Sequence, residues 1–299
     1  MEPIKRFVTS NDGTTIGYRQ VGEGPGLVVL HGSMSTGYNH IQLAEQLADR
    51  FTVYLPDRRG RGLSGPYRQG DTIESEVEDL IAVLTETGAQ DLAGVSYGAI
   101  ICLEAAVGRS SLGKIALYEP PLRMKNQKAV LERLESELAS GNVPAALVTA
   151  MKGTQMGPQF FDVMPRWLLV LMTRQMIAAM DRKGTGEYES FRALAPTLQY
   201  EARAIMTASA RIDRISAIRN EVLLVGGSKS AGHFKNALDL LADVLPRAER
   251  IELPGLGHPG AWNRDVGGKP EVVASAFEAF FRGVTAADRS GRAPVSLRG

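Results

Sequence analysis

Ser96 lies between two glycines in the segment Gly94–Gly98, which reads GVSYG. A short apolar run, Asp91–Val95, precedes the serine, and a stretch with helical spacing, Ala99–Gly108, follows it. This order matches G-x-S-x-G, in which the serine stands on a sharp strand-to-helix turn that flanking side chains would obstruct. Such a turn exposes the hydroxyl where backbone N–H groups and a helix N-terminus stabilise an anion. The pattern therefore predicts that Ser96 is a nucleophile.

Three further segments place polar groups at the ends of expected strands. The run Gly26–Leu30 ends in His31–Gly32 and then turns before a helix, so the loop that follows offers a second backbone N–H. The segment Leu55–Gly65 combines a strand end with a glycine-rich turn. His258 lies in a loop just after the last strand-like run, late in the chain. We expect the loop after His31–Gly32 to lie beside the serine turn.

Short apolar or β-branched runs, bounded by glycine and proline, alternate with segments of helical period. The strand-like runs are Gly26–Gly32, Phe51–Asp57, Asp91–Ser96, Lys114–Pro121, Glu221–Gly227 and Arg250–Gly255, and the helical segments include Ile73–Thr87, Ala99–Gly108, Phe234–Leu245 and Pro270–Arg282. Two earlier runs, Lys5–Ser10 and Thr14–Arg19, flank Asn-Asp-Gly and predict an antiparallel hairpin. The alternation predicts an α/β fold with a mostly parallel eight-stranded sheet and helices on both faces.

The alternation stops between about residues 121 and 210, a region of helical pattern that holds eight of the ten methionines. We expect residues 1–120 and 211–283 to form the α/β core, residues 121–210 an inserted all-helical cap, and residues 284–299 a flexible tail. Methionine provides adaptable apolar surface, so the cap is either ordinary helix–helix core or the roof of a pocket for an apolar substrate. The candidate pocket residues are Met34, His40, Met156, Trp167, Met172 and Met176.

The composition describes a soluble globular protein. The 299 residues include 34 basic and 33 acidic side chains, for a formal net charge of +1, so no nucleic-acid partner is expected. The N-terminus lacks an apolar signal region and no window holds 18 uninterrupted apolar residues, which argues against secretion and a membrane span. The single cysteine, Cys102, cannot form an internal disulfide, and a cytoplasmic location fits. We expect a monomer or homodimer whose partner is a small-molecule substrate, without a cofactor.

With these segments in this order, the sequence resembles the α/β-hydrolase superfamily over roughly residues 4–282. The matching segments are His31–Gly32, Asp57–Ser64 (DRRGRGLS), Gly94–Gly98 and Gly255–His258 (GLGH). The resemblance implies a chain order of serine, acid and histidine. Ser96 would attack a carbonyl carbon, and His258 would take the serine proton and pass it to the leaving group.

The resemblance also implies an oxyanion hole built from the backbone N–H groups of Tyr97 and Ser33. Tyr97 directly follows the nucleophile, where a donor usually stands, and Ser33 directly follows His31–Gly32. Met34 competes with Ser33 for the second position. Removal of one such donor typically raises the barrier by about 2.7–4 kcal/mol.

The acid departs from the usual family pattern, in which an aspartate follows the seventh strand in a G-x-x-D turn. Here that turn carries Ser228, Lys229 and Ser230, and no carboxylate lies between Glu221 and Asp239. The sequence therefore has to supply the acid from another strand end.

Glu119 is the first charged residue after the apolar run of the sixth expected strand, and two prolines follow it. Some superfamily members place their acid after this strand, so Glu119 is the predicted third member of the triad. The alternative is that Glu119 caps or salt-bridges the entry to the cap. Asp265, seven residues after His258, is a more distant competitor for the acid.

The remaining candidates have structural interpretations. Asp57 is expected to fix the turn after its strand, and His31 to pack behind the oxyanion loop. His40 either lines the pocket mouth or has a surface or capping role, whereas His233 and Cys102 are expected to be structural. No metal site is expected, because the four histidines do not cluster and there is no second cysteine.

Three classes of function fit these features. The first is a serine hydrolase that cleaves a carboxylic ester, thioester or lactone of a small to medium apolar substrate through an acyl-enzyme. The second is the same fold used for cofactor-free haloperoxidase-type perhydrolysis or for carbon–carbon bond hydrolysis. The third is a non-catalytic ligand-binding member, which the missing seventh-strand acid favours. Haloalkane dehalogenases and epoxide hydrolases resemble this fold but need an aspartate in place of Ser96.

Overall fold

The computed structural model describes residues 2–122, 126–154, 160–184 and 186–283. The candidate pocket residue Met156 and the expected tail, residues 284–299, lie outside the described residues.

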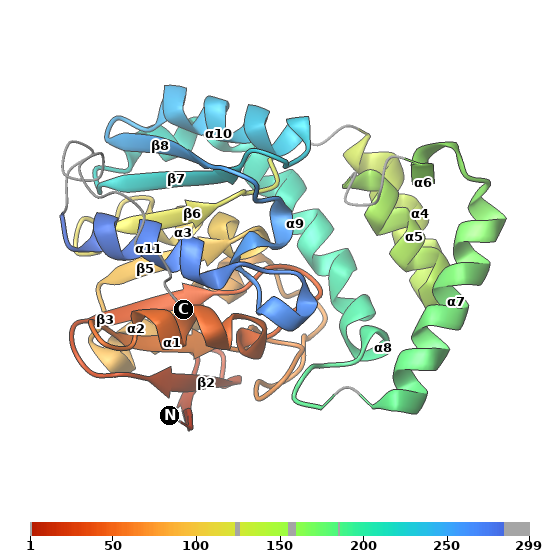
Figure 1. Ribbon diagram of the computed structural model, residues 1–299, viewed down its shortest axis with the longest axis horizontal. Helices are drawn as coiled ribbons and strands as arrows, with labels where there is room; N and C mark the ends of the chain where they lie inside the picture. Colours follow the sequence, from red (N-terminus) through yellow and green to blue (C-terminus); the bar gives the residue numbers. More distant parts are fainter. Residues whose placement is uncertain (1, 123–125, 155–159, 185, 284–299) are drawn as a thin grey trace, which may run out of the picture.

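The described residues form one sheet of eight strands (Figure 1). The strands are β1 (Ile4–Thr9), β2 (Thr15–Val21), β3 (Gly26–Leu30), β4 (Thr52–Pro56), β5 (Asp91–Val95), β6 (Ile115–Tyr118), β7 (Val222–Gly227) and β8 (Ala248–Leu253). Their order across the sheet is β1-β2-β4-β3-β5-β6-β7-β8. β2 pairs antiparallel with β1 and with β4, and every other pairing is parallel. The predicted fold class and the predicted hairpin are therefore confirmed.

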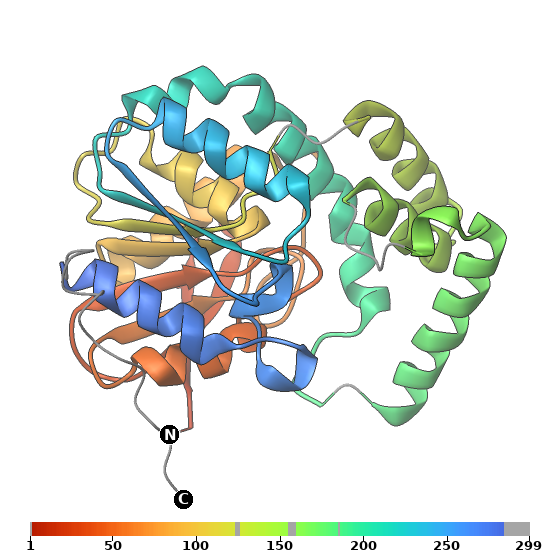
Figure 2. The same ribbon diagram turned by 45° about the horizontal axis from the view of Figure 1, so that its top comes forward.

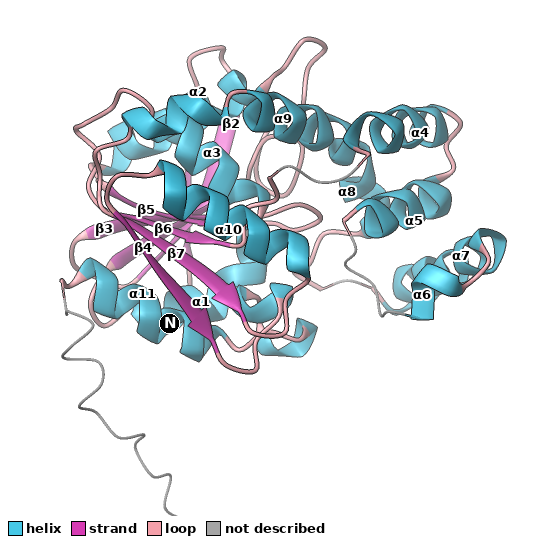
Figure 3. Cartoon of the chain, turned by 90° about the horizontal axis from the view of Figure 1, so that it is seen from above, coloured by secondary structure: helices cyan, strands magenta, loops and turns pink. Residues whose placement is uncertain are grey.

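The helices cover both faces of this sheet and lie beyond one end of its strands (Figures 1 and 3). They are α1 (Ile41–Leu47), α2 (Ile73–Thr87), α3 (Tyr97–Ala106), α4 (Gln127–Ala139), α5 (Val143–Gly153), α6 (Phe160–Val163), α7 (Arg166–Lys183), α8 (Phe191–Leu194), α9 (Leu198–Ala210), α10 (Gly232–Val244) and α11 (Pro270–Phe281). Short 3-10 helices span Gly37–His40, Ala195–Thr197, Ile212–Ala217, His258–Ala261 and Arg264–Val266. Helices α1 and α11 cover one face of the sheet, and α2, α3 and α10 cover the other (Figure 3).

The central strands are buried on both faces. In β5, Leu92 packs in the core cluster that includes α2 and α3, whereas Ala93 and Val95 pack in the cluster that includes α1 and α11. Because successive side chains of a strand point to opposite faces, both sets must be apolar. This explains why the strands appear in the sequence as continuous apolar runs.

The ends of the expected helices follow local signals. Helix α2 has the expected bounds, because Thr72 has extended backbone before its first turn and Gly88 closes it with a φ of 69°. Helix α3 begins at Tyr97, two residues before the expected start. The turn at Ser96 lets the helix begin immediately after the serine.

Helices α4–α8 lie together beside the sheet, and α9 runs from this group back onto the core (Figures 1 and 2). Met34, from the loop after β3, packs against the cluster of Leu134, Ala146 and Leu198, so these helices adjoin the carboxyl ends of the strands. In α9, Ala204 belongs to the core cluster of the sheet. The limits of the cap at residues 121 and 210 remain predictions. Within the described ranges, no helix combines the length and apolar character needed to cross a bilayer.

Candidate active site

Ser96 follows β5 directly and has a φ of 54° and a ψ of −121°. A serine in such a sparsely populated region costs about 1–3 kcal/mol, and this kind of strain is found mainly at functional sites. The flanking glycines permit the turn. A Cβ at Gly94 would lie 2.5 Å from the Cα of Ala99, and one at Gly98 would lie 2.3 Å from the carbonyl oxygen of Leu30. Only glycine fits at either position.

Of the three residues predicted to form a triad, His258 lies within hydrogen-bond distance of both Ser96 and Glu119. Nε2 of His258 accepts the hydroxyl of Ser96 at 3.1 Å, and Nδ1 of the same ring donates to Oε2 of Glu119 at 2.8 Å. All three side chains are buried. In this arrangement the imidazole can take the serine proton while the carboxylate fixes its tautomer.

The seventh-strand turn that lacks a carboxylate supplies hydrogen-bond donors to the acid. Oε1 of Glu119 accepts the backbone N–H of Gly227 at 2.7 Å and the hydroxyl of Ser230. Oε2 is left for His258. Glu119 also has a positive φ, 48°, so the acid stands on a strained backbone like the serine does. Sequence reasoning missed Ser230, although it occupies the last position of the G-x-x-D pattern.

The face of the His258 imidazole is covered by Phe234, the second missed residue. Their rings stack with centroids 4.2 Å apart and planes 11° apart. Phe234 comes from helix α10, directly after the turn that holds Glu119. The stacked ring restricts rotation of the imidazole, so its edge stays directed at Ser96 and Glu119.

Two backbone segments with predicted oxyanion donors adjoin Ser96. The N–H of Tyr97 belongs to the first residue of α3, where helical N–H groups have no partner within the helix. A Cβ at Gly32 would lie 2.9 Å from the Cβ of Ser96, so the Gly32–Ser33 backbone touches the nucleophile. Neither N–H donates a hydrogen bond to any residue that the structure describes. The roles of Tyr97 and Ser33 as oxyanion donors remain predictions. The competing Met34 has a φ of 52°.

Two of the histidines are neutral structural groups. His31 donates from Nδ1 to the carbonyl of Gly32 at 2.8 Å and accepts the N–H of Arg58 at Nε2; burial, followed by the charge of Arg58, lowers its pKa. His40 is fully buried and donates from Nδ1 to the carbonyl of Ala261 at 2.8 Å. Burial lowers the pKa of His40 to about 4. His40 therefore supports the loop behind His258.

A sequence model of the alpha/beta hydrolase family matches residues 27–276. This span contains Ser96, Glu119 and His258 together with the strands from β4 to β8. The chain belongs to the alpha/beta hydrolase family. It is an enzyme, a hydrolase.

Two known relatives of this alpha/beta hydrolase match most of its length, and a third matches less than half. The "Uncharacterized hydrolase YraK" of Bacillus subtilis (strain 168) is 26% identical over 259 residues, 83% of this chain and 87% of the relative. The crystal structure of an alpha/beta hydrolase from Sphaerobacter thermophilus DSM 20745 has a TM-score of 0.74 and 28% identity, over 92% of this chain and 100% of that chain. A non-heme haloperoxidase of Rhodococcus erythropolis is 29% identical over 128 residues, 40% of this chain and 47% of the relative.

Other predicted residues of this alpha/beta hydrolase are exposed or have hydrogen-bond partners outside the triad. Trp167, Met172 and Met176 all lie on α7, with 69%, 42% and 45% of their surfaces exposed. Asp57 fixes its turn, accepting the N–H groups of residues 37 and 63. Asp265 accepts the hydroxyl of Tyr188 at the surface instead of approaching the imidazole.

His233 lies at the start of α10, with its ring against that of Phe234. Both ring nitrogens are buried and have no hydrogen-bond partner among the described residues. Burial and then the nearby His258 lower the pKa of His233, so the ring is neutral. Cys102 is fully buried on α3, and burial raises the pKa of its thiol to about 12. This thiol is a packed apolar group rather than a nucleophile.

Proposed function

We propose that this hydrolase cleaves a carboxylic ester, thioester or lactone of a small to medium apolar substrate through an acyl-enzyme on Ser96. The observation that carries the proposal is the continuous chain of hydrogen bonds from Ser96 through His258 to Glu119, with distances of 3.1 and 2.8 Å. A general base within this distance of a hydroxyl, itself oriented by a buried carboxylate, is the arrangement that activates a serine.

Acylation begins when Oγ of Ser96 forms a bond to the substrate carbonyl carbon and its proton passes to Nε2 of His258. The negative charge that develops on the carbonyl oxygen meets the N–H groups of Tyr97 and Ser33. The carbon–oxygen or carbon–sulfur bond to the leaving group then breaks. The leaving alcohol or thiol takes the proton from His258. Throughout, Glu119 stabilises the positively charged imidazole.

Deacylation repeats these steps with water. His258 takes a proton from the water, whose oxygen attacks the acyl carbon, and returns that proton to Oγ of Ser96 as the ester bond breaks. The acid product leaves, and the enzyme is restored without a cofactor.

The apolar character of the proposed substrate rests on the helices beside the strand ends. Met34 extends from the loop that adjoins the nucleophile to the apolar cluster of Leu134, Ala146 and Leu198. Exposed apolar side chains of α7, including Trp167, lie on the same group of helices. A cytoplasmic location, and a monomeric or homodimeric state, remain predictions.

A second candidate is perhydrolysis, which the similarity to a non-heme haloperoxidase over 128 residues favours. Hydrogen peroxide would then replace water in the attack on the acyl-enzyme and release a peracid. The first half of the reaction is the same in both cases. Analysis of the products formed with water or with peroxide as acceptor separates these two candidates. Cleavage of a carbon–carbon bond in a test substrate would instead indicate carbon–carbon bond hydrolysis, and both candidates would be rejected.

The first test is labelling with a fluorophosphonate probe, read by intact mass, with p-nitrophenyl butyrate turnover measured in parallel. We expect the wild-type protein to gain one adduct at Ser96, and Ser96→Ala to gain none. The Glu119→Gln variant should label slowly and lose most of its turnover, because the imidazole loses its orienting charge. Unchanged turnover in a folded Glu119→Gln protein would exclude Glu119 as the acid. Absence of labelling in the wild type, with stoichiometric ligand binding, would favour the non-catalytic alternative.

A further inference from the structure

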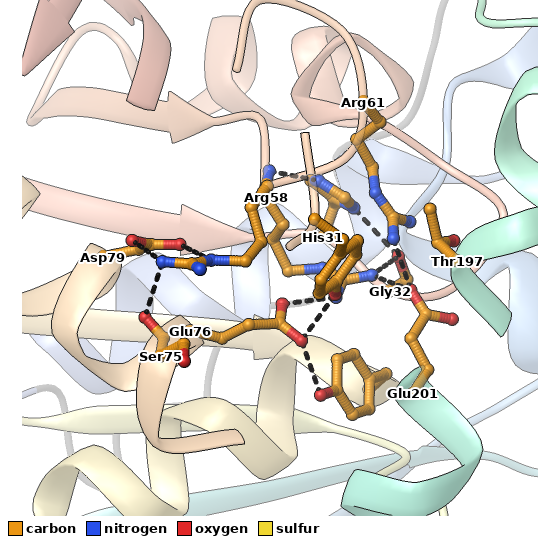
Figure 4. A network of polar contacts seen from close by, with 12 residues as sticks. His31, Gly32, Arg58, Arg61, Ser75, Glu76, Asp79, Thr197 and Glu201 are labelled. Carbon is orange, nitrogen blue, oxygen red and sulfur yellow. Dashed lines mark hydrogen bonds and ion pairs between the residues drawn. The ribbon is translucent and has the colours of Figure 1, made fainter. Parts of the chain in front are cut away.

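The carbonyl oxygen of Gly32 accepts three hydrogen bonds from side chains. Two donors are Nη2 of Arg58 at 3.0 Å and Nδ1 of His31 at 2.8 Å (Figure 4). The third is the hydroxyl of Ser35 at 3.0 Å. In a trans peptide the C=O and N–H groups point in opposite directions, and the described chain has no cis peptide bond. The three donors therefore direct the N–H of Ser33 away from Arg58.

The Cα of Gly32, which adjoins this peptide unit, lies beside the nucleophile. A Cβ on Gly32 would come within 2.9 Å of the Cβ of Ser96. The orientation of one peptide plane thus decides whether the second oxyanion donor is available. An unclamped peptide beside a glycine rotates easily, because glycine has few forbidden backbone conformations.

Arg58 is itself held from several sides. Nη1 donates to Oε2 of Glu76 at 2.7 Å, Nη2 also donates to Glu201, and the guanidinium lies 4.5 Å from the centre of the Tyr97 ring (Figure 4). Glu76 is in turn held by the hydroxyls of Tyr97 and Tyr67, each at 2.7 Å. Burial opposes the charge of Arg58, but the two carboxylates raise its pKa well above the ordinary value. The guanidinium is therefore a fixed, permanently charged donor.

Glu201 brings helix α9 into this network. Its buried carboxylate accepts from Nη2 of Arg61 at 2.7 Å as well as from Arg58. Burial opposes its ionisation, but the charges of the two arginines and the neighbouring Ser33 hydroxyl lower its pKa. The two arginines and the two carboxylates, Glu76 and Glu201, balance in charge. A balanced buried set of this kind is costly to desolvate and adds little stability by itself.

We propose that Arg58, held by Glu76 and Glu201, is a positioning residue that orients the Gly32–Ser33 peptide for the oxyanion hole. This inference rests on the proposed serine hydrolase function. It gives a function to the buried network of two arginines and two glutamates, which takes no part in the chemistry of the triad. It also links helix α9 to the reacting centre through Glu201.

The test compares Arg58→Lys with Arg59→Lys. Arg59 is the matched control, since it is also buried and pairs with Asp79 and Asp71 but is not among the described donors to the Gly32 carbonyl. Both variants keep the positive charge and lose the planar fork of donors. For Arg58→Lys we expect kcat for p-nitrophenyl butyrate to fall tenfold or more with KM within threefold. Affinity for a butyl boronic acid, which mimics the tetrahedral intermediate, should fall in parallel. Arg59→Lys should lose stability only.

A purely structural role predicts a different result: equal, small effects of the two variants on kcat. That result in folded proteins would overturn the inference. Glu201→Gln provides a second variant, in which the arginine keeps its bond to Gly32 but loses one charged acceptor. We expect a threefold or larger fall in kcat with KM unchanged. Wild-type kcat in both Arg58→Lys and Glu201→Gln would also reject the proposal.

A crystal structure of Arg58→Lys makes the test independent of activity. A Gly32–Ser33 peptide that has rotated, so that the Ser33 N–H points in another direction, supports the inference. An unrotated peptide contradicts it. If the wild type fails to react with the fluorophosphonate, the serine hydrolase function is wrong, yet the peptide orientation in the variant still decides the role of Arg58.

Discussion

The hydroxyl of Tyr118 donates a 2.6 Å hydrogen bond to the carbonyl oxygen of Gly257. Tyr118 directly precedes Glu119 at the end of β6, and Gly257 directly precedes His258. This bond therefore links the residue before Glu119 to the residue before His258, which lie 139 positions apart in the chain. The triad geometry is thus supported beside the reacting groups as well as through them.

We expect Tyr118→Phe to lower kcat about three- to tenfold and to reduce the free energy of unfolding by about 1–2 kcal/mol, because the substitution removes one largely buried hydrogen bond. Urea denaturation and steady-state kinetics measure the two effects. Tyr54→Phe is the control, since the Tyr54 hydroxyl makes no hydrogen bond to the described residues. Equal kcat values for the two variants would contradict the supporting role of Tyr118.

Ser230→Ala removes one of the two donors to Oε1 of Glu119 and leaves the N–H of Gly227 as the other. The carboxylate gains freedom to rotate, so kcat/KM should fall about three- to thirtyfold. Ser230→Thr, which keeps the hydroxyl, should recover most of the activity. If threonine is as damaging as alanine, volume rather than the hydrogen bond is important at this position.

The contact between Ser230 and Glu119 also predicts that an aspartate at position 230 can replace Glu119 as the acid of the triad. In Glu119→Gln with Ser230→Asp, a carboxylate stands at the usual seventh-strand position. We expect at least tenfold more turnover than in Glu119→Gln alone. Ser228→Asp in the same background is the control, because the Ser228 hydroxyl accepts the N–H of Gly255 and lies outside the contacts of Glu119. Equal recovery with both aspartates would point to a non-specific charge effect.

The backbone conformation at Ser96 predicts that glycine at this position gives a more stable protein than alanine. With a φ of 54°, Ser96→Gly should be more stable than Ser96→Ala by about 1 kcal/mol, since glycine adopts this conformation without strain. Both variants lack the nucleophile, so the comparison is free of catalytic effects. Thermal and urea unfolding give the difference. Gly94→Ala should destabilise strongly, because its Cβ would meet Ala99 at 2.5 Å. Equal stability of the two Ser96 variants would show that the turn is unstrained.

His40 predicts a loss of stability in acid. Its pKa is lowered from 6.5 to about 4 in the folded protein, so the unfolded chain binds a proton that the folded chain does not. The stabilisation is complete above pH 6.5 and is lost as the pH falls through about 4. For His40 alone the change is about 3 kcal/mol. Urea titrations between pH 7 and pH 4 should show a smaller loss for His40→Asn, which keeps a donor for Ala261; an identical loss would refute this assignment.

Local patterns in the sequence predicted most of the fold and the three triad candidates. The turn at Ser96 is indicated by glycines only two residues away on either side. The order of strands and helices follows from the alternation of strand-like apolar runs with segments of helical periodicity. Glu119 could be selected because the seventh-strand turn has no carboxylate and because β6 neighbours β5. The elements follow from information close together in the chain, whereas the triad roles rest on the resemblance to the α/β-hydrolase superfamily and on comparison of two distant strand ends.

The buried network could not be predicted, because its partners are far apart. Arg58 and Glu201 are separated by 143 residues, and nothing local to either one identifies the other. Helical spacing in Leu198–Ala210 likewise does not indicate which surface that helix covers. Ser230 is an intermediate case, since its position in the turn was noticed but its hydroxyl depends on a glutamate from another strand.

Glu119 is followed by Pro120, Pro121 and the buried Leu122, after which the chain continues toward α4–α8. A chimaera that takes its helices from a relative with a seventh-strand acid would lose its carboxylate if the graft began before Glu119. The reverse transplant, carried out with Glu119 included, would give the recipient two carboxylates competing for one imidazole. These helices can therefore be exchanged between relatives without changing the acid only if the junction lies after Leu122.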